Sequence, residues 1–148
     1  MPASFEYAEH KRLRCTAGAD MGSGGAAYKV LLLMRGTSAG SEPLITNLAA
    51  FSDLLEFDDG AYVRGTLASQ TLTVDATTAQ AVFDAADQAF GILDGDGSDL
   101  VIAALIAKDG ASDAARVPAF YIDRSPAFDP GSTDPYTLRW NADGIFRC

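Results

Sequence analysis

Histidine and cysteine, which often supply catalytic bases, nucleophiles and metal ligands, are nearly missing from this chain of 148 residues. It has one histidine, His10, and two cysteines, Cys15 and Cys148. A Ser–His–Asp or Cys–His arrangement needs a histidine held rigidly beside its nucleophile, and His10 lies in a terminal segment that reads as an arm. The two cysteines stand far apart without a Cys-x-x-Cys pair, which argues against a zinc site. We therefore expect no enzyme, no cofactor and two unpaired thiols.

Long apolar runs and an excess of positive charge are also missing. The longest apolar run, Val30 to Met34, is too short to span a bilayer, and the N-terminus has no apolar stretch typical of a signal peptide. The net charge is −9, so nucleic-acid phosphates should repel the chain. We expect neither a membrane nor a nucleic acid among its partners, and synthesis in the cytoplasm.

What the chain does have is a series of short β-type runs, rich in Val, Ile, Leu, Thr and aromatic residues and ended by Asp, Gly, Asn or Pro. They predict a mainly β protein: an antiparallel β-sandwich or jelly roll with one short helix and an extended N-terminal arm. Asn47–Phe57 has helical spacing of its apolar residues and is the one good helix candidate. The expected strands are Tyr28–Arg35, a short one near Tyr62–Arg64, Leu72–Val74, Ala81–Ala85, Leu100–Ala107, Pro118–Ile122, Tyr136–Trp140 and Ile145–Phe146.

The predicted core consists of the apolar residues that face inward on these strands. Leu72 and Val74 belong to it because they alternate with polar residues, which is typical of a half-buried strand. Trp140 belongs to it because an aromatic residue on an alternating strand usually packs against a core. The set is Leu31, Leu33, Leu72, Val74, Phe83, Val101, Ile102, Leu105, Phe120, Ile122, Leu138 and Trp140.

The composition divides the chain into an arm, residues 1–26, and a β-sandwich domain, residues 27–148. Gly22, Gly24 and Gly25 form a flexible hinge between them. Two interpretations of the arm stay open: a solvated terminus, or a segment that orders against a neighbouring subunit. In the second case the anchors at the partner interface would be Phe5, Tyr7 and Leu13.

One loop resembles the start of a calcium-binding loop. Asp94, Asp96 and Asp99 lie in the sequence DGDGSD, but the sixth position lacks the required Gly and the twelfth, Leu105, lacks the bidentate Glu. A solvated turn between two strands explains the loop better, so we expect no metal site and keep these residues as a weak candidate.

The ordered set YKVLLLM, TLTVD, AVFDA, VIAALIAKDG, AFYID and WNADGI resembles a family of small structural proteins of tailed bacteriophages. The similarity covers roughly residues 28 to 147 and keeps the order of the elements. The resemblance implies a virion component, and among such components a capsid decoration or cement protein. Its partners would be the major capsid protein and further copies of itself, in a dimer or trimer, on the capsid surface of the virion.

Two other functions stay open. A tail, tail-tip or fibre-base component fits the same resemblance. A carbohydrate-binding β-sandwich module, with calcium in the Asp94–Asp99 loop, would belong to a different class.

Overall fold

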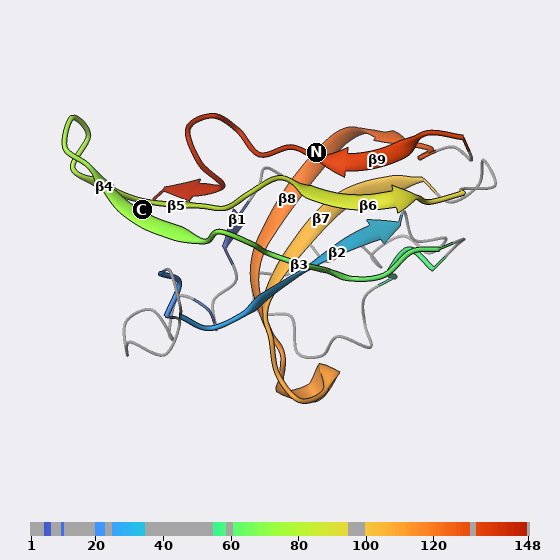
Figure 1. Cartoon of the computed structure of the whole chain (residues 1–148), viewed down its shortest axis with the longest axis horizontal. Coiled ribbons are helices and arrows are strands. Elements are labelled where there is room, and N and C mark those ends of the chain that lie inside the picture. Colours follow the sequence, from blue (N-terminus) through green and yellow to red (C-terminus); the bar gives the residue numbers. More distant parts are fainter. Residues whose placement is uncertain are drawn as a thin grey trace.

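The computed structural model describes residues 5–6, 10, 20–22, 25–34, 55–58, 61–94, 100–130 and 133–147 (Figure 1). These residues form antiparallel β-sheets, with a 3-10 turn at Asp113–Ala115. The mainly β fold class predicted from the sequence is confirmed. Within the described ranges, no helix is long and apolar enough to cross a membrane.

The largest sheet has five strands, and its centre is the most apolar part of the chain. β7, Val101–Lys108, pairs on one side with β2, Tyr28–Met34, and on the other with β8, Val117–Phe128. Both β2 and β7 are buried on both faces, as their near-continuous apolar sequences predict. Two short strands complete the sheet in the order β1-β8-β7-β2-β3: β1 is Phe5–Glu6 and β3 is Gly65–Thr66. The short strand expected near Tyr62–Arg64 therefore lies just after that position.

A second sheet is built on a hairpin. β4, Thr71–Asp75, and β5, Gln80–Asp84, pair across a four-residue turn, which confirms the hairpin expected here. β10, Phe146–Arg147, adds to the other side of β5. In Figure 1 the turn end of the hairpin extends to the left, away from the strands of the five-stranded sheet.

The third sheet contains a strand that the sequence did not indicate. β6, Gln88–Ile92, pairs with β9, Pro135–Leu138. The register shifts between Ala89 and Gly91, and Gly91 has a φ of +75°. A glycine inside a short strand at a bulge hides the two-residue alternation by which strands are recognised.

All three sheets contribute to one apolar core. Tyr28 and Leu32 from β2, Phe83 from β5, Phe90 from β6, and Leu138 from β9 are buried in the same cluster. A second cluster, on the opposite face of β2 and β7, consists of Leu31, Leu33, Ile102, Ala103, Leu105, Ala107 and Tyr121.

The predicted helix over Asn47–Phe57 is wrong at its C-terminal end. The part up to residue 54 lies outside the described residues, but Leu55, Glu56 and Phe57 are extended. Glu56 forms a β-bridge with Leu33, and the Phe57 N–H donates to the Leu32 carbonyl over 2.9 Å. Pairing with the edge of β2 therefore overrides the local helical spacing.

Most of the predicted core is correct, including Phe83 in the hairpin strand β5, and the clear errors lie in the other hairpin strand, β4. Leu72 is 50% exposed and Val74 is 73% exposed, although their strand forms as expected. Ile122 and Trp140 are only partly buried, packed against the edge of the first cluster. The other predicted core residues are buried.

Candidate functional site

The sequence-predicted interface residues are only partly within the described ranges. Phe5 lies in β1, where it pairs in register with Tyr121 of β8. Tyr7 and Leu13 lie outside the described residues, as do Cys15, Cys148 and Gly24. The described residues of the segment 1–26 include Glu6, His10 and Met21, all three of which are buried.

The candidate calcium loop is also mostly outside the described ranges. Asp94 is described and has a φ of +54°, whereas Asp96 and Asp99 are not described. Among the residues that the structure does describe, no group of three or more His, Cys, Asp or Glu side chains could hold a metal ion.

His10 is held much more firmly than its place in the sequence indicates. Its ring is fully buried, with Nδ1 at 2.7 Å from Glu6 Oε1 and Nε2 at 2.9 Å from the Tyr28 hydroxyl. The ring also makes an edge contact with Phe120, at a centroid distance of 4.9 Å. These contacts tie the segment before β2 to β2 and β8. Because the His10 ring and the Glu6 side chain are buried, they stabilise the fold and are not reached by a substrate.

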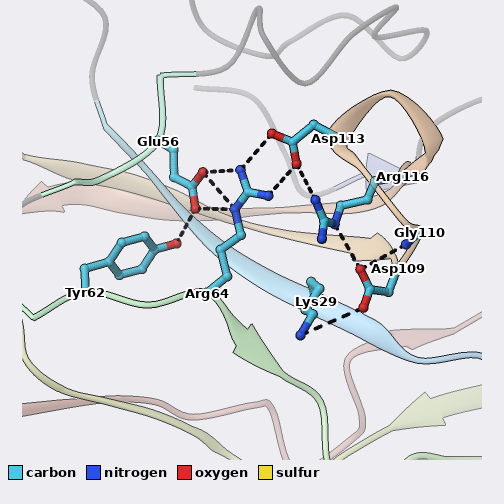
Figure 2. A network of polar contacts seen from close by, with 8 residues as sticks. All are labelled: Lys29, Glu56, Tyr62, Arg64, Asp109, Gly110, Asp113 and Arg116. Carbon is cyan, nitrogen blue, oxygen red and sulfur yellow. Dashed lines mark hydrogen bonds and ion pairs between the residues drawn. The ribbon is translucent and has the colours of Figure 1, made fainter.

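A network of polar contacts joins three distant parts of the chain on the surface (Figure 2). At its centre the Arg64 guanidinium donates to both carboxylate oxygens of Glu56, at 2.7 to 3.0 Å. The Tyr62 hydroxyl donates to the same carboxylate over 2.8 Å, and the Leu32 N–H donates to that hydroxyl over 3.0 Å. Burial, and then the charge of Glu56, raise the pKa of Tyr62 well above its usual value, so the hydroxyl stays protonated as a donor.

The network continues from Arg64 to the connection between β7 and β8. Arg64 Nη1 lies 2.5 Å from Asp113 Oδ1, and Arg116 contacts the same carboxylate. Arg116 Nε also donates to Asp109 Oδ1 over 2.9 Å, and Lys29 Nζ lies 3.9 Å from Asp109 Oδ2.

The charges of this network fix its protonation state. The hydrogen bond from Arg64 lowers the pKa of Asp113. Burial acts to raise the pKa of Asp109, but hydrogen bonds from the Gly110 N–H and from Arg116 bring it below the usual value. Each of these carboxylates is therefore ionised and paired at neutral pH.

The network is suited to holding structure and not to catalysis. Its carboxylates are occupied by guanidinium donors, and among the described residues no Ser, Cys or His side chain belongs to it. A general base must be able to accept a proton from a substrate, which a carboxylate paired with a guanidinium does poorly. The network clamps the segment around Glu56 and Arg64 onto the β7–β8 connection.

An exposed apolar surface lies on the β4–β5 hairpin. Leu72 lies directly opposite Phe83, and Val74 directly opposite Ala81, so these residues share one face of the hairpin. Phe83 is in the core, whereas Leu72 and Val74 lie on the edge strand of their sheet and are exposed. We call Leu72 and Val74 the hairpin face. An isolated exposed apolar residue is ordinary, but two on an edge strand that continue a core face form a surface ready to be covered.

Comparisons with known proteins add no assignment to these sites. No protein-family model matches this chain, and neither a curated protein nor a solved structure matches it significantly.

Proposed function

We propose that this protein is a structural protein of a tailed-bacteriophage virion, and within that class a decoration or cement protein on the outer surface of the capsid. The single observation that carries an assembly role is the hairpin face, Leu72 and Val74, exposed on the edge strand β4. The virion itself is inferred from the family resemblance of the ordered strand sequences.

The edge strand lacks the devices that keep such strands from pairing with other chains. β4 reads Thr-Leu-Thr-Val-Asp, with no Lys, no Pro and no bulge in its pairing with β5. Thr and Val favour extended structure, so the strand is ready to accept a neighbouring strand while its apolar residues dock. This combination suits attachment to a subunit of a larger assembly.

We further propose that the sheets form a sandwich and that the protein has two kinds of partner. The five-stranded sheet packs its first cluster against residues of both other sheets, which supports a sandwich of the jelly-roll type. The partners would be the major capsid protein and other copies of this chain, in a dimer or trimer. The segment 1–26, with Phe5, Tyr7 and Leu13, would extend the contact across subunit boundaries.

The physical role is stabilisation by mass action. A protein that binds the assembled, expanded shell, and not its free subunits, stabilises the shell by its binding free energy at every site. Many symmetric sites multiply this effect, and an oligomer that bridges subunits gains further from effective concentration. Such a role needs surfaces and a stable fold but no catalytic group.

The test is binding to expanded shells of the same phage that lack the protein. The purified protein is mixed with the shells, the shells are pelleted, and the bound copies are counted by calibrated densitometry. We expect saturation on the order of hundreds of copies per shell, one for each of many symmetric sites. A few dozen copies or fewer, found on tails instead, would assign a tail component. Binding to host-surface sugars without binding to either would support the carbohydrate module.

A matched pair of variants tests whether the hairpin face makes the contact. Val74 and Val63 are both 73% exposed, and only Val74 lies on the hairpin face. We expect Leu72→Thr combined with Val74→Thr to weaken shell binding at least about tenfold, from the loss of buried apolar area. Val63→Thr should leave binding unchanged. Equal binding by both variants would remove the hairpin from the interface. Point variants are preferable to deleting the arm, because Glu6 and His10 are buried in the fold.

A further inference from the structure

A cleft on the side of β8, β9 and β10 gathers positive charge in an otherwise acidic protein. The chain has only 11 Lys and Arg residues against 20 acids, yet three of its arginines line this one cleft, against a single acidic residue, Asp143. They are Arg124 in β8, Arg139 just after β9, and Arg147 in β10. The cleft has a volume of about 420 Å³ and is open on one side.

Two of the three arginines, Arg124 and Arg139, are not neutralised by a neighbouring carboxylate of the described residues. Arg147 is occupied, with Asp75 at 3.1 Å and Asp143 at 3.3 Å. Within the described ranges, neither Arg124 nor Arg139 forms an ion pair with a carboxylate. Arg124 Nε itself is buried, and the neighbouring polar group is the Tyr136 hydroxyl, whose pKa is raised by burial and lowered in part by the charge of Arg124 and a hydrogen bond from it. Arg124 still lines the cleft and has no carboxylate of the described residues to balance its charge.

The guanidinium of Arg124 is positioned by an aromatic ring. Its Cζ lies 5.7 Å from the centre of the Phe128 ring, and that ring packs against Tyr136 at 5.0 Å. A guanidinium over a ring face loses little rotamer freedom when it binds a carboxylate.

Trp140 forms a fixed wall of the cleft. Its indole Nε1–H donates to the Ala86 carbonyl over 2.9 Å, and its backbone N–H donates to Asp87 Oδ1 over 3.0 Å. Apolar side chains complete the lining between the arginines: Ile122, Leu138, Ile145 and Phe146. The lining therefore combines cationic and apolar groups.

We infer that this cleft binds an acidic peptide segment of a partner protein, with carboxylates on Arg124 and Arg139 and an apolar side chain on Trp140. Guanidinium and carboxylate match in charge and in planar, two-point geometry. A small inorganic anion would leave the apolar lining uncovered, whereas an extended peptide with alternating acidic and apolar residues covers both kinds of group. The inference does not depend on the virion role.

Trp140 makes the test direct, because it is the only tryptophan in the chain and lies in the cleft. The probe is the acetylated and amidated peptide Glu-Val-Glu-Val-Glu, titrated into the full-length protein while tryptophan emission and calorimetric heat are recorded. We expect a saturable change in emission with a matching heat. The same peptide with Gln in place of Glu should bind at least about tenfold more weakly, because it cannot form charge-assisted hydrogen bonds. Inorganic phosphate and a galacturonate oligomer serve as the competing anions.

Variants separate the cleft from general charge effects. Arg139 is exposed, so Arg139→Gln should leave the thermal unfolding temperature unchanged while weakening peptide binding about tenfold. Lys29→Gln removes the same charge from a residue outside the cleft and should leave binding unchanged. Arg124→Lys keeps the charge but loses the planar fork, and should fall between the two.

Three results would overturn the inference. They are no saturable change with the acidic peptide, equal affinity for the Gln peptide, and equal losses in Arg139→Gln and Lys29→Gln. Saturable binding of galacturonate without binding of the peptide would instead assign the cleft to acidic sugars. None of these results depends on shell binding, so the capsid proposal and this one can fail separately.

Discussion

Strands β2 and β4 have similar local sequences, but β2 is almost wholly buried and β4 is almost wholly exposed. Both are rich in residues that favour extended structure, and both pair with an antiparallel neighbour, β2 with one register shift between Leu33 and Met34 and β4 with none. Leu32 in β2 is fully buried, whereas Leu72 in β4 is 50% exposed. Local sequence therefore decides that a strand forms, and the elements stacked above and below it decide whether its apolar residues are core or surface.

The largest effect should come from truncating the same residue type in the two strands. We expect Leu32→Ala to lower the free energy of unfolding by about 3 kcal/mol, because it leaves a cavity in a cluster shared by three sheets. Leu72→Ala should cost about 0.5 kcal/mol or less, as at an exposed site. Urea unfolding followed by far-ultraviolet circular dichroism measures both. Equal losses would mean that Leu72 is buried in the protein in solution, for instance by self-association, and dilution would then reveal it.

The contrast between the two strands explains which predictions from sequence succeed. The near-continuous apolar runs at Tyr28–Met34 and Val101–Lys108 need burial on both faces, so their central position in the sheet could be predicted. The alternation of Leu72 and Val74 indicates one buried face only if another layer covers it. That depends on how far the hairpin extends beyond the five-stranded sheet, and no local pattern encodes this.

Long-range contacts account for the other differences. The extended conformation of Leu55–Phe57 is set by pairing with Leu33 and Leu32, more than twenty residues earlier in the chain. The burial of His10 depends on Tyr28 and Phe120, which no sequence spacing relates to it. The one sequence signal for this contact is the spacing of Glu6 and His10, which are four residues apart, because an acidic and a basic side chain at that spacing often interact.

The cleft and the polar network could not be predicted from the sequence. Composition shows only that Lys and Arg are few, and the convergence of three arginines on one cleft depends on the adjacency of β8, β9 and β10. Likewise, Glu56, Arg64 and Asp113 come together only through the fold.

A second comparison concerns two glycines that pin strands of the smaller sheets. Gly144, before β10, has a φ of +96°, and a Cβ there would lie 2.5 Å from Val82 Cγ1. Gly91, in β6, has a φ of +75° but open space around the same position. We expect Gly91→Ala to lose about 1 kcal/mol of stability from the left-handed backbone alone. Gly144→Ala should lose about 2 kcal/mol, because steric overlap adds to the backbone cost. Thermal unfolding measures both, and equal losses would show that Val82 moves aside freely.

The smallest expected losses of stability come from removing an arginine of the polar network and an arginine that pairs with the hairpin. Arg64→Gln removes a two-point contact with half-buried Glu56 and a contact with Asp113, and we expect it to cost about 1 kcal/mol. Arg147→Gln removes contacts with Asp75 and with Asp143, whose side chain is 79% exposed, and should cost roughly 0.5 kcal/mol or less. Thermal unfolding at low salt measures the two costs.

The pH dependence of the Arg64 effect has a definite sign. Arg64 lowers the pKa of Asp113 in the folded chain below its unfolded value of 3.8. A carboxyl with a lowered folded pKa contributes stability above its unfolded pKa and loses it as the pH falls through the folded pKa. The difference between the native protein and Arg64→Gln should therefore be constant from pH 8 to about pH 5 and shrink below about pH 4. If the difference instead grew on acidification, the contact with Asp113 could not be the source of the stabilisation. The clamp would then act through the packing of the Arg64 side chain.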